Sequence, residues 1–397
     1  MRRSVALAFA AMLACFIPEG RAADASGEIR LGTITDLSGP AAPYGHAVVN
    51  ALRLRFDAVN AMGGIRGRRI RLIVEDHQFQ VPRAVQAAAK LIKRDRVQAF
   101  VGALGTAQVQ AVLPQLREAG IPNLFPMAAS RALVQAPDSV TWISGSLYYD
   151  QIRAGVKWMV EQRGKRAVCA LAQSTDYGEE VQQALRDQLA QHGQSLLAVA
   201  THRPTDTDFT ASIARLRAAN CDLVVLATLL RDTLLPMATA RAAGWSVDFL
   251  GPSTTHDYLL AAAPGNATQG LYSVSSIALP DKTSAAPAVL AWIEAYTARF
   301  GTAPNAGAIY GATIADLAVL TFDRAGEQAR EQAWEQAGAN RDPVLFARAV
   351  HSISGWRDLF GGTLQDFSAG RRQGTRQAVV WQLNGPRYER LTEALGY

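Results

Sequence analysis

The chain of 397 residues is poor in cysteine and histidine, and it lacks the short motifs that mark common enzyme active sites. Its three cysteines and six histidines are scattered, without the close spacing of metal ligands. It has no Gly-x-Ser-x-Gly turn, no Gly-x-x-x-x-Gly-Lys phosphate loop and no Gly-x-Gly-x-x-Gly after a strand. The adjacent pair His256-Asp257 looks most like a reactive dyad, but turn and helix-cap chemistry explains it better. We therefore expect no catalytic residue, no cofactor and no metal.

Long apolar runs are also missing: beyond the first residues we find no uncharged segment long enough to cross a bilayer. The start itself has a basic beginning, an apolar run over residues 4–17 and small residues before a cut after Ala22. That order is typical of a secretory signal, so residues 1–22 are expected to be a signal peptide and the protein to lie in the periplasm. A lipid anchor on Cys15 is the alternative, because residues 12–15 roughly fit a lipidation box.

The charge balance excludes a nucleic-acid partner. Without the signal peptide, 37 basic and 33 acidic residues leave a net charge of +4, and the basic residues form no stripe.

The two remaining cysteines, Cys169 and Cys221, lie in or beside apolar, strand-like runs, which favours buried free thiols. A disulfide between them is the alternative in an oxidising compartment. We expect a monomer.

Short strands alternate with amphipathic helices over most of the remaining chain. Strands are expected at residues 29–35, 70–74, 98–101 and 121–125, and, after residue 143, at 167–171, 195–199, 221–227 and 248–250. Helices are expected between them at residues 48–62, 82–93, 106–119, 151–162, 178–192, 208–219 and 234–243. The last third is expected to hold helices at 286–300, at 309–325 and up to 339, then extended segments at 362–367 and 377–383. This order predicts an α/β fold with two Rossmann-like lobes, each a parallel sheet covered by helices.

Ligands of such sheets bind beyond the carboxyl ends of the strands, where helix N-termini present free N–H groups. Four expected loops meet this description, at residues 36–45, 102–108, 127–130 and 174–178. They supply candidate binding residues: Tyr44, Gly105, Thr106, Ser130 and Tyr177. Helix capping by Thr106 and Ser130, and packing of the two tyrosines against loops, are the alternatives.

Several stretches, taken in order, also carry a family resemblance. They are residues 29–40 with Tyr44-Gly45, then 57–69, 176–180, 206–210 and 217–225. With these stretches the chain resembles periplasmic binding proteins of the branched-chain amino acid ABC transporter type, along almost all of its mature length. The resemblance implies a type I periplasmic binding fold, in which two α/β lobes are joined by a hinge of several crossings and a ligand is clamped between them.

The resemblance also implies how the chain divides into lobes and which residues hold the ligand. The first lobe is expected to be discontinuous, with residues 28–143 and 275–350, and the second to comprise 144–274 and 351–397. The loops that hold a ligand carboxylate in this family map to Gly105, Thr106 and Gln108 and to Ala128, Ala129 and Ser130. The aromatic residue before the first helix maps to Tyr44, and the tyrosine of the second lobe to Tyr177.

One departure from the family pattern concerns the ligand. Members that bind amino acids carry an acidic residue after a Gly-Pro in the second lobe, where it pairs with the ligand ammonium. Here Gly251-Pro252 is followed by Ser253, and the first carboxylate is Asp257. A buried ammonium without a counter-charge is costly, so we expect a carboxylate or aromatic acid instead of a branched-chain amino acid. The loop with Ser253 and His256 is expected to complete the site.

The function expected from these features is that of an extracytoplasmic solute-binding receptor, not an enzyme. Its partners would be a small-molecule ligand and the membrane permease subunits of an ABC transporter, and closure of the hinge would bury the ligand. A receptor that feeds a signalling partner is the alternative. An exported enzyme on a Rossmann-like fold would need a cofactor loop or a reactive dyad, which the sequence does not show.

Overall fold

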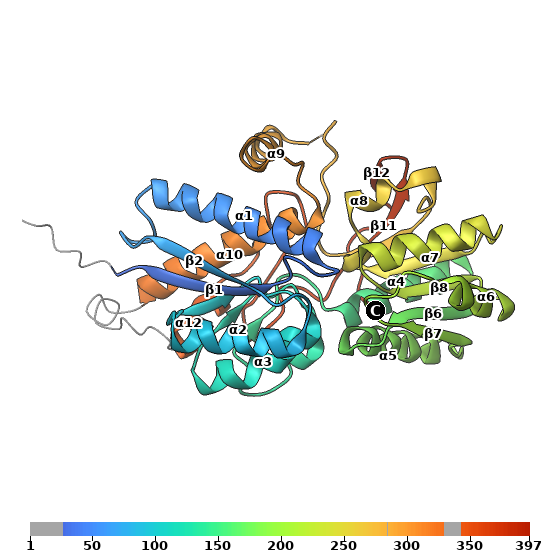
Figure 1. Cartoon of the computed structure of the whole chain (residues 1–397), viewed down its shortest axis with the longest axis horizontal. Coiled ribbons are helices and arrows are strands. Elements are labelled where there is room, and N and C mark those ends of the chain that lie inside the picture. Colours follow the sequence, from blue (N-terminus) through green and yellow to red (C-terminus); the bar gives the residue numbers. More distant parts are fainter. Residues whose placement is uncertain (1–26, 284, 329–342) are drawn as a thin grey trace, which may run out of the picture.

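The computed structural model describes residues 27–283, 285–328 and 343–397. Two lobes lie end to end in it, each built on its own sheet (Figure 1). The expected signal peptide, the alternative lipid site at Cys15 and the end of the helical stretch expected up to residue 339 lie outside the described residues.

The first lobe is a parallel sheet of five strands in the order β2-β1-β3-β4-β5. Its strands are β1 (Ile29–Thr35), β2 (Ile70–Asp76), β3 (Ala99–Val101), β4 (Asn123–Leu124) and β5 (Thr141–Trp142). Helices α2 (Val81–Lys93) and α3 (Thr106–Glu118) pack together on one apolar cluster, and α1 (Ala42–Ala61), α10 (Ala306–Gln328) and α12 (Pro343–His351) pack on another. Parallel strands between two helical layers are buried on both faces, which explains why every residue of β1 except Arg30 is buried.

Helix α10 is the one helix of the described residues that is long and apolar enough to cross a membrane. Its most apolar window is 72% buried inside the protein, and the helix packs along α1. Its apolar composition is therefore that of a core helix. Asp316 lies inside the helix, so α10 is not an uncharged run and does not contradict the expectation that no later uncharged segment is long enough to cross a bilayer.

The second lobe is a sheet of seven strands in the order β12-β11-β10-β9-β8-β6-β7. Its strands are β6 (Val168–Gln173), β7 (Ala198–His202), β8 (Leu223–Ala227), β9 (Asp248–Pro252), β10 (Tyr272–Ser275), β11 (Val379–Asn384) and β12 (Arg387–Arg390). Strands β6 to β10 are parallel, whereas β11 and β12 form an antiparallel hairpin at the edge. The main helices are α4 (Tyr148–Arg163), α5 (Asp176–Gln191), α6 (Thr210–Ala218) and α7 (Leu230–Ala242), with a short α8 (Tyr258–Ala261) after β9.

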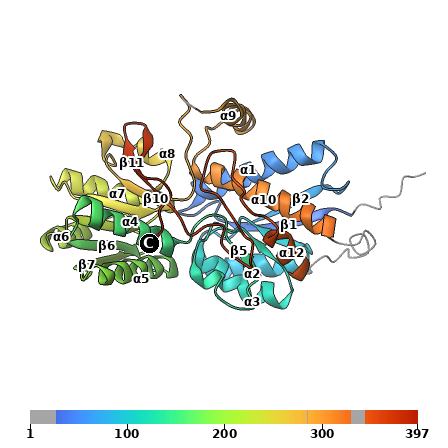
Figure 2. The same ribbon diagram turned by 180° about the vertical axis from the view of Figure 1, so that it is seen from behind.

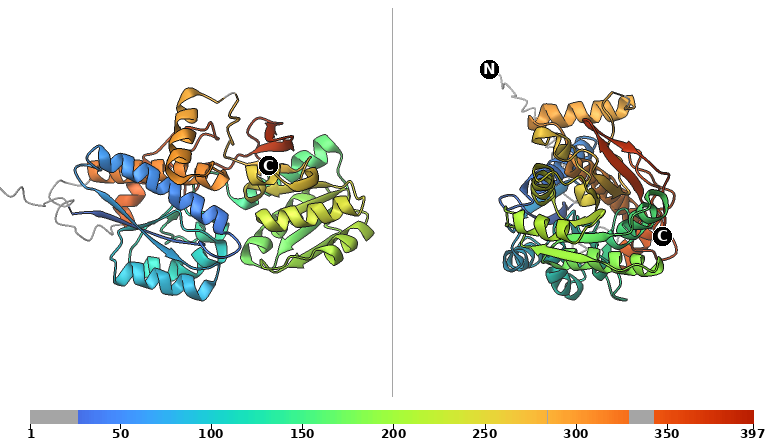
Figure 3. Two further views of the ribbon diagram at one scale, coloured as in Figure 1. Left: turned by 45° about the horizontal axis from the view of Figure 1, so that its top comes forward. Right: turned by 90° about the vertical axis from the view of Figure 1, so that its right-hand side faces the viewer.

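The chain leaves the second lobe after β10 and returns to it for β11. In between it forms α9 (Pro287–Phe300), which stands out on one side of the molecule, and then α10 and α12 of the first lobe (Figures 1 and 3). The segment after α12 crosses back between the lobes behind the molecule (Figure 2). The expected α/β class with two sheets and several crossings is therefore confirmed.

The crossing segments are hydrogen-bonded to one another where they pass between the lobes. The N–H of Gly145 donates to Gln365 Oε1 (3.0 Å), and the N–H of Ser146 donates to Ser276 Oγ (3.1 Å). Gly145 has φ +80°, and a Cβ at this position would lie 2.3 Å from Ser276 Oγ. The three segments therefore pack closely enough here to require glycine.

Two expectations about local structure differ from the fold. Cys169 and Cys221 are joined in a disulfide, with Cα atoms 5.9 Å apart, and are not free thiols. The register of β6 with β8 brings both residues to one end of neighbouring strands, a proximity that the sequence does not reveal. The extended segment expected at 362–367 forms no strand beyond an isolated bridge between Trp356 and Gln365.

Candidate functional site

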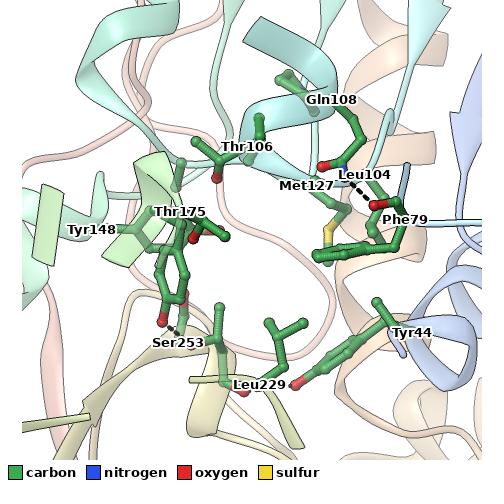
Figure 4. A pocket seen from close by; sticks show the side chains of 18 of the residues that line it. Tyr44, Phe79, Leu104, Thr106, Gln108, Met127, Tyr148, Thr175, Leu229 and Ser253 are labelled. Atoms are coloured by element: carbon green, nitrogen blue, oxygen red, sulfur yellow. Dashed lines mark hydrogen bonds between the residues drawn. The ribbon is translucent and has the colours of Figure 1, made fainter. Parts of the chain in front are cut away.

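A cavity of about 230 Å³ lies between the two lobes, at the carboxyl ends of the first strands of both sheets (Figure 4). Its first-lobe wall is made of Ala41, Tyr44, Phe79, Val81, residues 104–108 and 126–129, Tyr310 and Ile314. The second lobe and the crossings contribute Ser144, Ser146, Tyr148, Gln173, Thr175, Tyr177, Pro204, Leu229, Ser253 and Thr254.

Each lobe places a tyrosine in the cavity by the same local arrangement, a Tyr-Gly pair in the first turn of a helix. Tyr44 and Tyr177 occupy the first turn of the helix that follows the first strand of their lobe, and a glycine comes next in both. A Cβ on Gly45 would lie 1.8 Å from the carbonyl oxygen of Asp36, and one on Gly178 would lie 1.9 Å from that of Gln173. The glycines therefore let each helix start directly against the end of its strand, which fixes the tyrosine at the mouth of the sheet.

The two tyrosine hydroxyls meet at one residue of the second lobe, Thr254. Tyr44 donates to the carbonyl oxygen of Thr254 across the cavity (3.1 Å). The Tyr177 hydroxyl is 2.7 Å from Thr254 Oγ1 and also donates to the carbonyl oxygen of Thr228 (3.2 Å). Burial raises the pKa of both phenols, so they remain neutral hydroxyls. Tyr177 is also stacked edge-on against Tyr148, so it has a packing role beside any contact with ligand.

The first lobe offers backbone donors at the opposite wall. The N–H groups of Thr106, Ala107 and Gln108, at the start of α3, make no hydrogen bond within the described part of the chain. The same holds for the N–H groups of Ala128 and Ala129 on the neighbouring loop. A helix N-terminus with free N–H groups is a site for an anion, and these donors can hold a carboxylate without a cationic side chain.

Gly105 gives the α3 terminus this geometry. It has φ +100°, and a Cβ there would lie 2.3 Å from Gln108 Oε1. Gln108 is in turn fixed by donating to the carbonyl oxygen of Phe79 (2.8 Å), a bond visible in Figure 4. Thr106 does not cap α3; it is the first residue of the helix and lines the cavity.

No Asp, Glu, Lys, Arg or His is among the lining residues in the part of the chain that the structure describes. The two carboxylates that could have met an amine are engaged or distant. Asp257 is buried outside the lining, where it accepts from the N–H groups of Leu259 (2.8 Å) and Ala306 (3.1 Å). Asp176 is exposed at the start of α5. The lining side chains are therefore uncharged, and their polar groups are hydroxyls, amides and backbone N–H groups; Asp257 lies behind the lining, against Tyr44.

Two of the expected site residues lie outside the cavity lining. Ser130 caps the short η1 helix (Arg131–Leu133) by accepting from the N–H of Ala132 (3.3 Å), and its hydroxyl donates to the carboxylate of Glu180 on α5. Glu180 Oε1 also accepts from the N–H of Arg131 (2.9 Å). This contact joins the two lobes beside the cavity, so the alternative of a capping role describes Ser130.

His256 lies in the interior of the second lobe. Its ring is stacked on Trp381 with centroids 5.1 Å apart and meets the Tyr388 ring edge-on at 4.5 Å. Burial lowers its pKa to about 3, so the imidazole is neutral. Both aromatic partners come from the C-terminal hairpin, more than a hundred residues later, and sequence reasoning did not pair them with His256.

The other expected residues line the cavity together: Tyr44, Gly105, Thr106, Gln108, Ala128, Ala129, Tyr177 and Ser253. Their roles as ligand contacts remain predictions. Sequence reasoning missed Phe79, Tyr148, Thr175, Leu229 and Tyr310, among others. Of these five, Thr175 alone lies in one of the expected binding loops. Phe79 reaches the cavity because it and the preceding residue both have positive φ, 52° at Gln78 and 56° at Phe79. This backbone conformation is uncommon in residues other than glycine and is not predicted from the sequence.

Comparison with known proteins decides the family. A family model described as periplasmic binding protein matches residues 28–387. The chain belongs to this family. The family resemblance and the absence of an enzymatic role are therefore confirmed, and the chain is a periplasmic solute-binding protein of the type that serves ABC transporters.

Individual relatives of this periplasmic binding protein differ in the ligands they are named for. The Leu/Ile/Val-binding protein of Escherichia coli is 24% identical over 361 residues, which cover 90% of this chain and 92% of the relative. A fatty acid ABC transporter substrate-binding protein from Thermomonospora curvata has the same fold, with a TM-score of 0.81, 23% identity and 94% and 93% coverage of the two chains. A solute-binding protein from R. palustris in complex with benzoate has a TM-score of 0.77, 19% identity and 94% and 98% coverage.

Proposed function

We propose that this protein is the extracytoplasmic receptor of an ABC uptake transporter and closes on a small monocarboxylate with an apolar body. The observation that carries the proposal is the uncharged cavity lining, which within the described residues offers five free backbone N–H groups at one wall and no carboxylate for an amine. Backbone donors at a helix N-terminus favour a carboxylate, whereas a buried ammonium without a counter-charge is costly.

The apolar part of the lining supports the same ligand class. Phe79, Leu104, Met127, Leu229 and Ile314 surround the space between the N-terminus of α3 and the tyrosines. They suit the hydrocarbon body of an aliphatic or aromatic acid of modest size. The fatty acid and benzoate named for two proteins of the same fold are both carboxylic acids with apolar bodies.

Ligand capture is proposed to use closure of the lobes about the crossings near Gly145, with the lobe boundaries expected from the sequence. Tyr44 and Ser130 of the first lobe contact Thr254 and Glu180 of the second, so the arrangement described is a closed one. The closed shape would be what the permease subunits recognise, and the protein would act as a monomer in the periplasm.

Pairs of compounds that differ only in the α-ammonium test the ligand class. Calorimetric titrations would compare 4-methylpentanoate with leucine, and 3-phenylpropanoate with phenylalanine. We expect at least one acid of the two pairs to bind at least about a hundredfold more tightly than its amino acid, since an unpaired buried ammonium costs several kcal/mol. Leucine or phenylalanine binding as tightly as its deaminated partner would rule out the proposed ligand class.

A transport measurement tests the receptor role separately. Cells that make the protein naturally would be compared with the same cells lacking its gene for uptake of the radiolabelled acid at concentrations near its Kd. Loss of uptake without the gene is expected. Unchanged uptake, with a purified protein that binds the acid, would favour a signalling receptor.

A further inference from the structure

A second hollow, of about 610 Å³, lies outside the ligand cavity and shares no lining residue with it. We call it the arginine groove, after Arg131, Arg371, Arg372 and Arg376, which line it. Arg131 follows β4 in the first lobe, and the other three lie on the segment that crosses back towards β11. The groove therefore touches both the first lobe and the crossing segment that leads into the second.

Arg371 pairs with Asp366, and Arg131 Nε lies 3.5 Å from Glu180 Oε1. The loosely balanced positive charge in the groove is therefore that of Arg372 and Arg376. Asp150 is the one acidic lining residue among those the structure describes, and its Oδ2 accepts from Gln373 Nε2 (2.7 Å). Arg376 Nη2 approaches Asp150 Oδ1 to only 3.7 Å, and 69% of the Arg376 side chain is exposed. A contact of this length leaves most donors of the Arg376 guanidinium open to solvent.

Arg372 lacks a counter-ion within 4 Å in the described part of the chain. Its Nη1 is buried and has no hydrogen-bond partner, and its guanidinium lies 5.0 Å from the ring centroid of Trp142. Burial lowers the pKa of Arg372, an effect that the charge of Asp138 partly opposes. A partly buried cation without a carboxylate nearby gains free energy from an anion that binds its accessible edge, although the buried Nη1 itself is not open to the groove.

The wall of the groove is held in place by stacked side chains. The Arg131 guanidinium lies 3.5 Å from the centroid of the Tyr149 ring, and that of Arg153 lies 3.9 Å from the Tyr397 ring. The hydroxyl of Tyr397 accepts from Arg376 Nη2 (2.6 Å). These contacts fix the direction of the guanidinium groups, so little ordering is needed when an anion binds.

We propose that the arginine groove is a binding site for a small multivalent oxyanion, of the phosphate or polycarboxylate class, held by Arg372 and Arg376. The planar fork of a guanidinium matches the oxygens of such anions and forms paired hydrogen bonds with them. The site is independent of the cavity and of the carboxylate proposed for it.

Titration calorimetry with pyrophosphate tests the site, in a phosphate-free buffer whose ionic strength is held constant with sodium chloride. Saturable binding of one pyrophosphate per chain is expected. Arg376→Gln should weaken it about tenfold or more, as the loss of a charge-assisted hydrogen bond does. Arg215→Gln is the matched control. Arg215 is exposed on α6 and is not part of the groove lining, so this substitution removes the same charge outside the groove. The Kd for pyrophosphate should change less than about twofold in this variant.

Further variants make the result decisive. Arg372→Gln should weaken binding as Arg376→Gln does, but it touches Trp142 and could impair folding, so the exposed Arg376 carries the test. Thr106→Val alters the ligand cavity and should leave pyrophosphate binding unchanged. Absence of saturable binding, equal losses in Arg215→Gln and Arg376→Gln, or a loss in Thr106→Val alone would each overturn the proposal.

Discussion

At the scale of single residues, Thr254 is the common hydrogen-bond partner of the two tyrosines of the site. One tyrosine from each lobe ends on it, Tyr44 on its carbonyl oxygen and Tyr177 on its hydroxyl. The bond from Tyr44 spans the lobes, whereas that from Tyr177 stays within the second. Removing the Tyr44 hydroxyl should therefore affect closure without affecting the core of either lobe.

Tyr44→Phe is expected to weaken binding of the cognate acid about fivefold, because it removes one hydrogen bond of about 1 kcal/mol that forms on closure. Calorimetry with the tightest acid of the panel measures the effect. Tyr388→Phe is the matched control, since its hydroxyl donates to the carbonyl oxygen of Thr255 (3.0 Å) within the second lobe. Equal losses of affinity in the two variants would contradict a special role of the interlobe bond.

His256 should make the protein sensitive to acid. Its pKa is lowered to about 3 in the fold and returns to about 6.5 on unfolding. Below pH 6.5 the unfolded chain binds a proton that the native imidazole does not, so stability is lost as the pH falls. Between pH 6.5 and 4.5 the free energy of unfolding of the wild type should fall by about 2 kcal/mol relative to His256→Gln. Urea denaturation of both proteins at the two pH values measures this; a constant difference between them would show that His256 does not titrate as buried.

Residue-level prediction from sequence succeeded in placing side chains at the cavity where a loop follows a strand directly, as for Tyr44, Thr106 and Tyr177. It misplaced His256, because the local sequence around a histidine in a polar loop does not indicate whether its ring contacts solvent, a ligand or an aromatic residue distant in sequence. Here Trp381 and Tyr388 pack on it from the far end of the chain. Contacts between residues so far apart in sequence cannot be predicted from the sequence around either residue.

At the scale of elements, the strands β6 and β8 are joined covalently as well as by hydrogen bonds. The Cys169–Cys221 disulfide closes a segment of 52 residues that contains α5, β7 and α6. Limiting the freedom of such a loop in the unfolded chain stabilises the folded state by about 4 kcal/mol. The second lobe alone carries this bond in the described residues.

Replacing both cysteines by alanine should lower the free energy of unfolding by about 4 kcal/mol. Urea denaturation with and without reductant measures the loss. Reductant should destabilise the wild type and leave the double variant unchanged. A wild type as stable in reductant as without it would mean that the bond contributes nothing to stability.

Elements with a strong pattern were predictable, and weak ones were not. The long strand β1 follows from its run of Ile, Leu and Thr residues, and helix α1 follows from helical spacing, although α1 begins six residues earlier than expected, at Ala42. The two-residue strand β5 and the edge strand β12 carry no comparable pattern. They are strands because neighbouring strands supply their hydrogen bonds, which is a property of the sheet and not of the segment.

At the scale of the whole molecule, the proposed closure of the lobes would bend the crossings beside Gly145. The residue combines a positive φ with a contact that leaves no room for a Cβ. Its neighbours on the other crossings, Ser276 and Gln365, are held by the hydrogen bonds of Gly145 and Ser146. A side chain here should disturb the closed arrangement before it disturbs either lobe.

Gly145→Ala is expected to weaken ligand binding about tenfold or more, since strain of about 1–3 kcal/mol would oppose closure. Small-angle scattering should show less compaction on adding the acid than in the wild type. Gly164→Ala is the control: its φ is +66°, but no atom lies within 4 Å of its added Cβ, and it ends α4 away from the crossings. That variant should lose stability and keep its affinity; the reverse outcome would remove Gly145 from the hinge.

Because the chain returns to each lobe, the synthesis of the two lobes overlaps in time. The first lobe lacks α10 and α12 until residue 351 has been made, and the second lacks β11 and β12 until residue 390. A chain delivered from its N-terminus therefore cannot finish one half and then begin the other. The second half is begun before the first is complete, and no cut of the gene at a single point separates one lobe from the other.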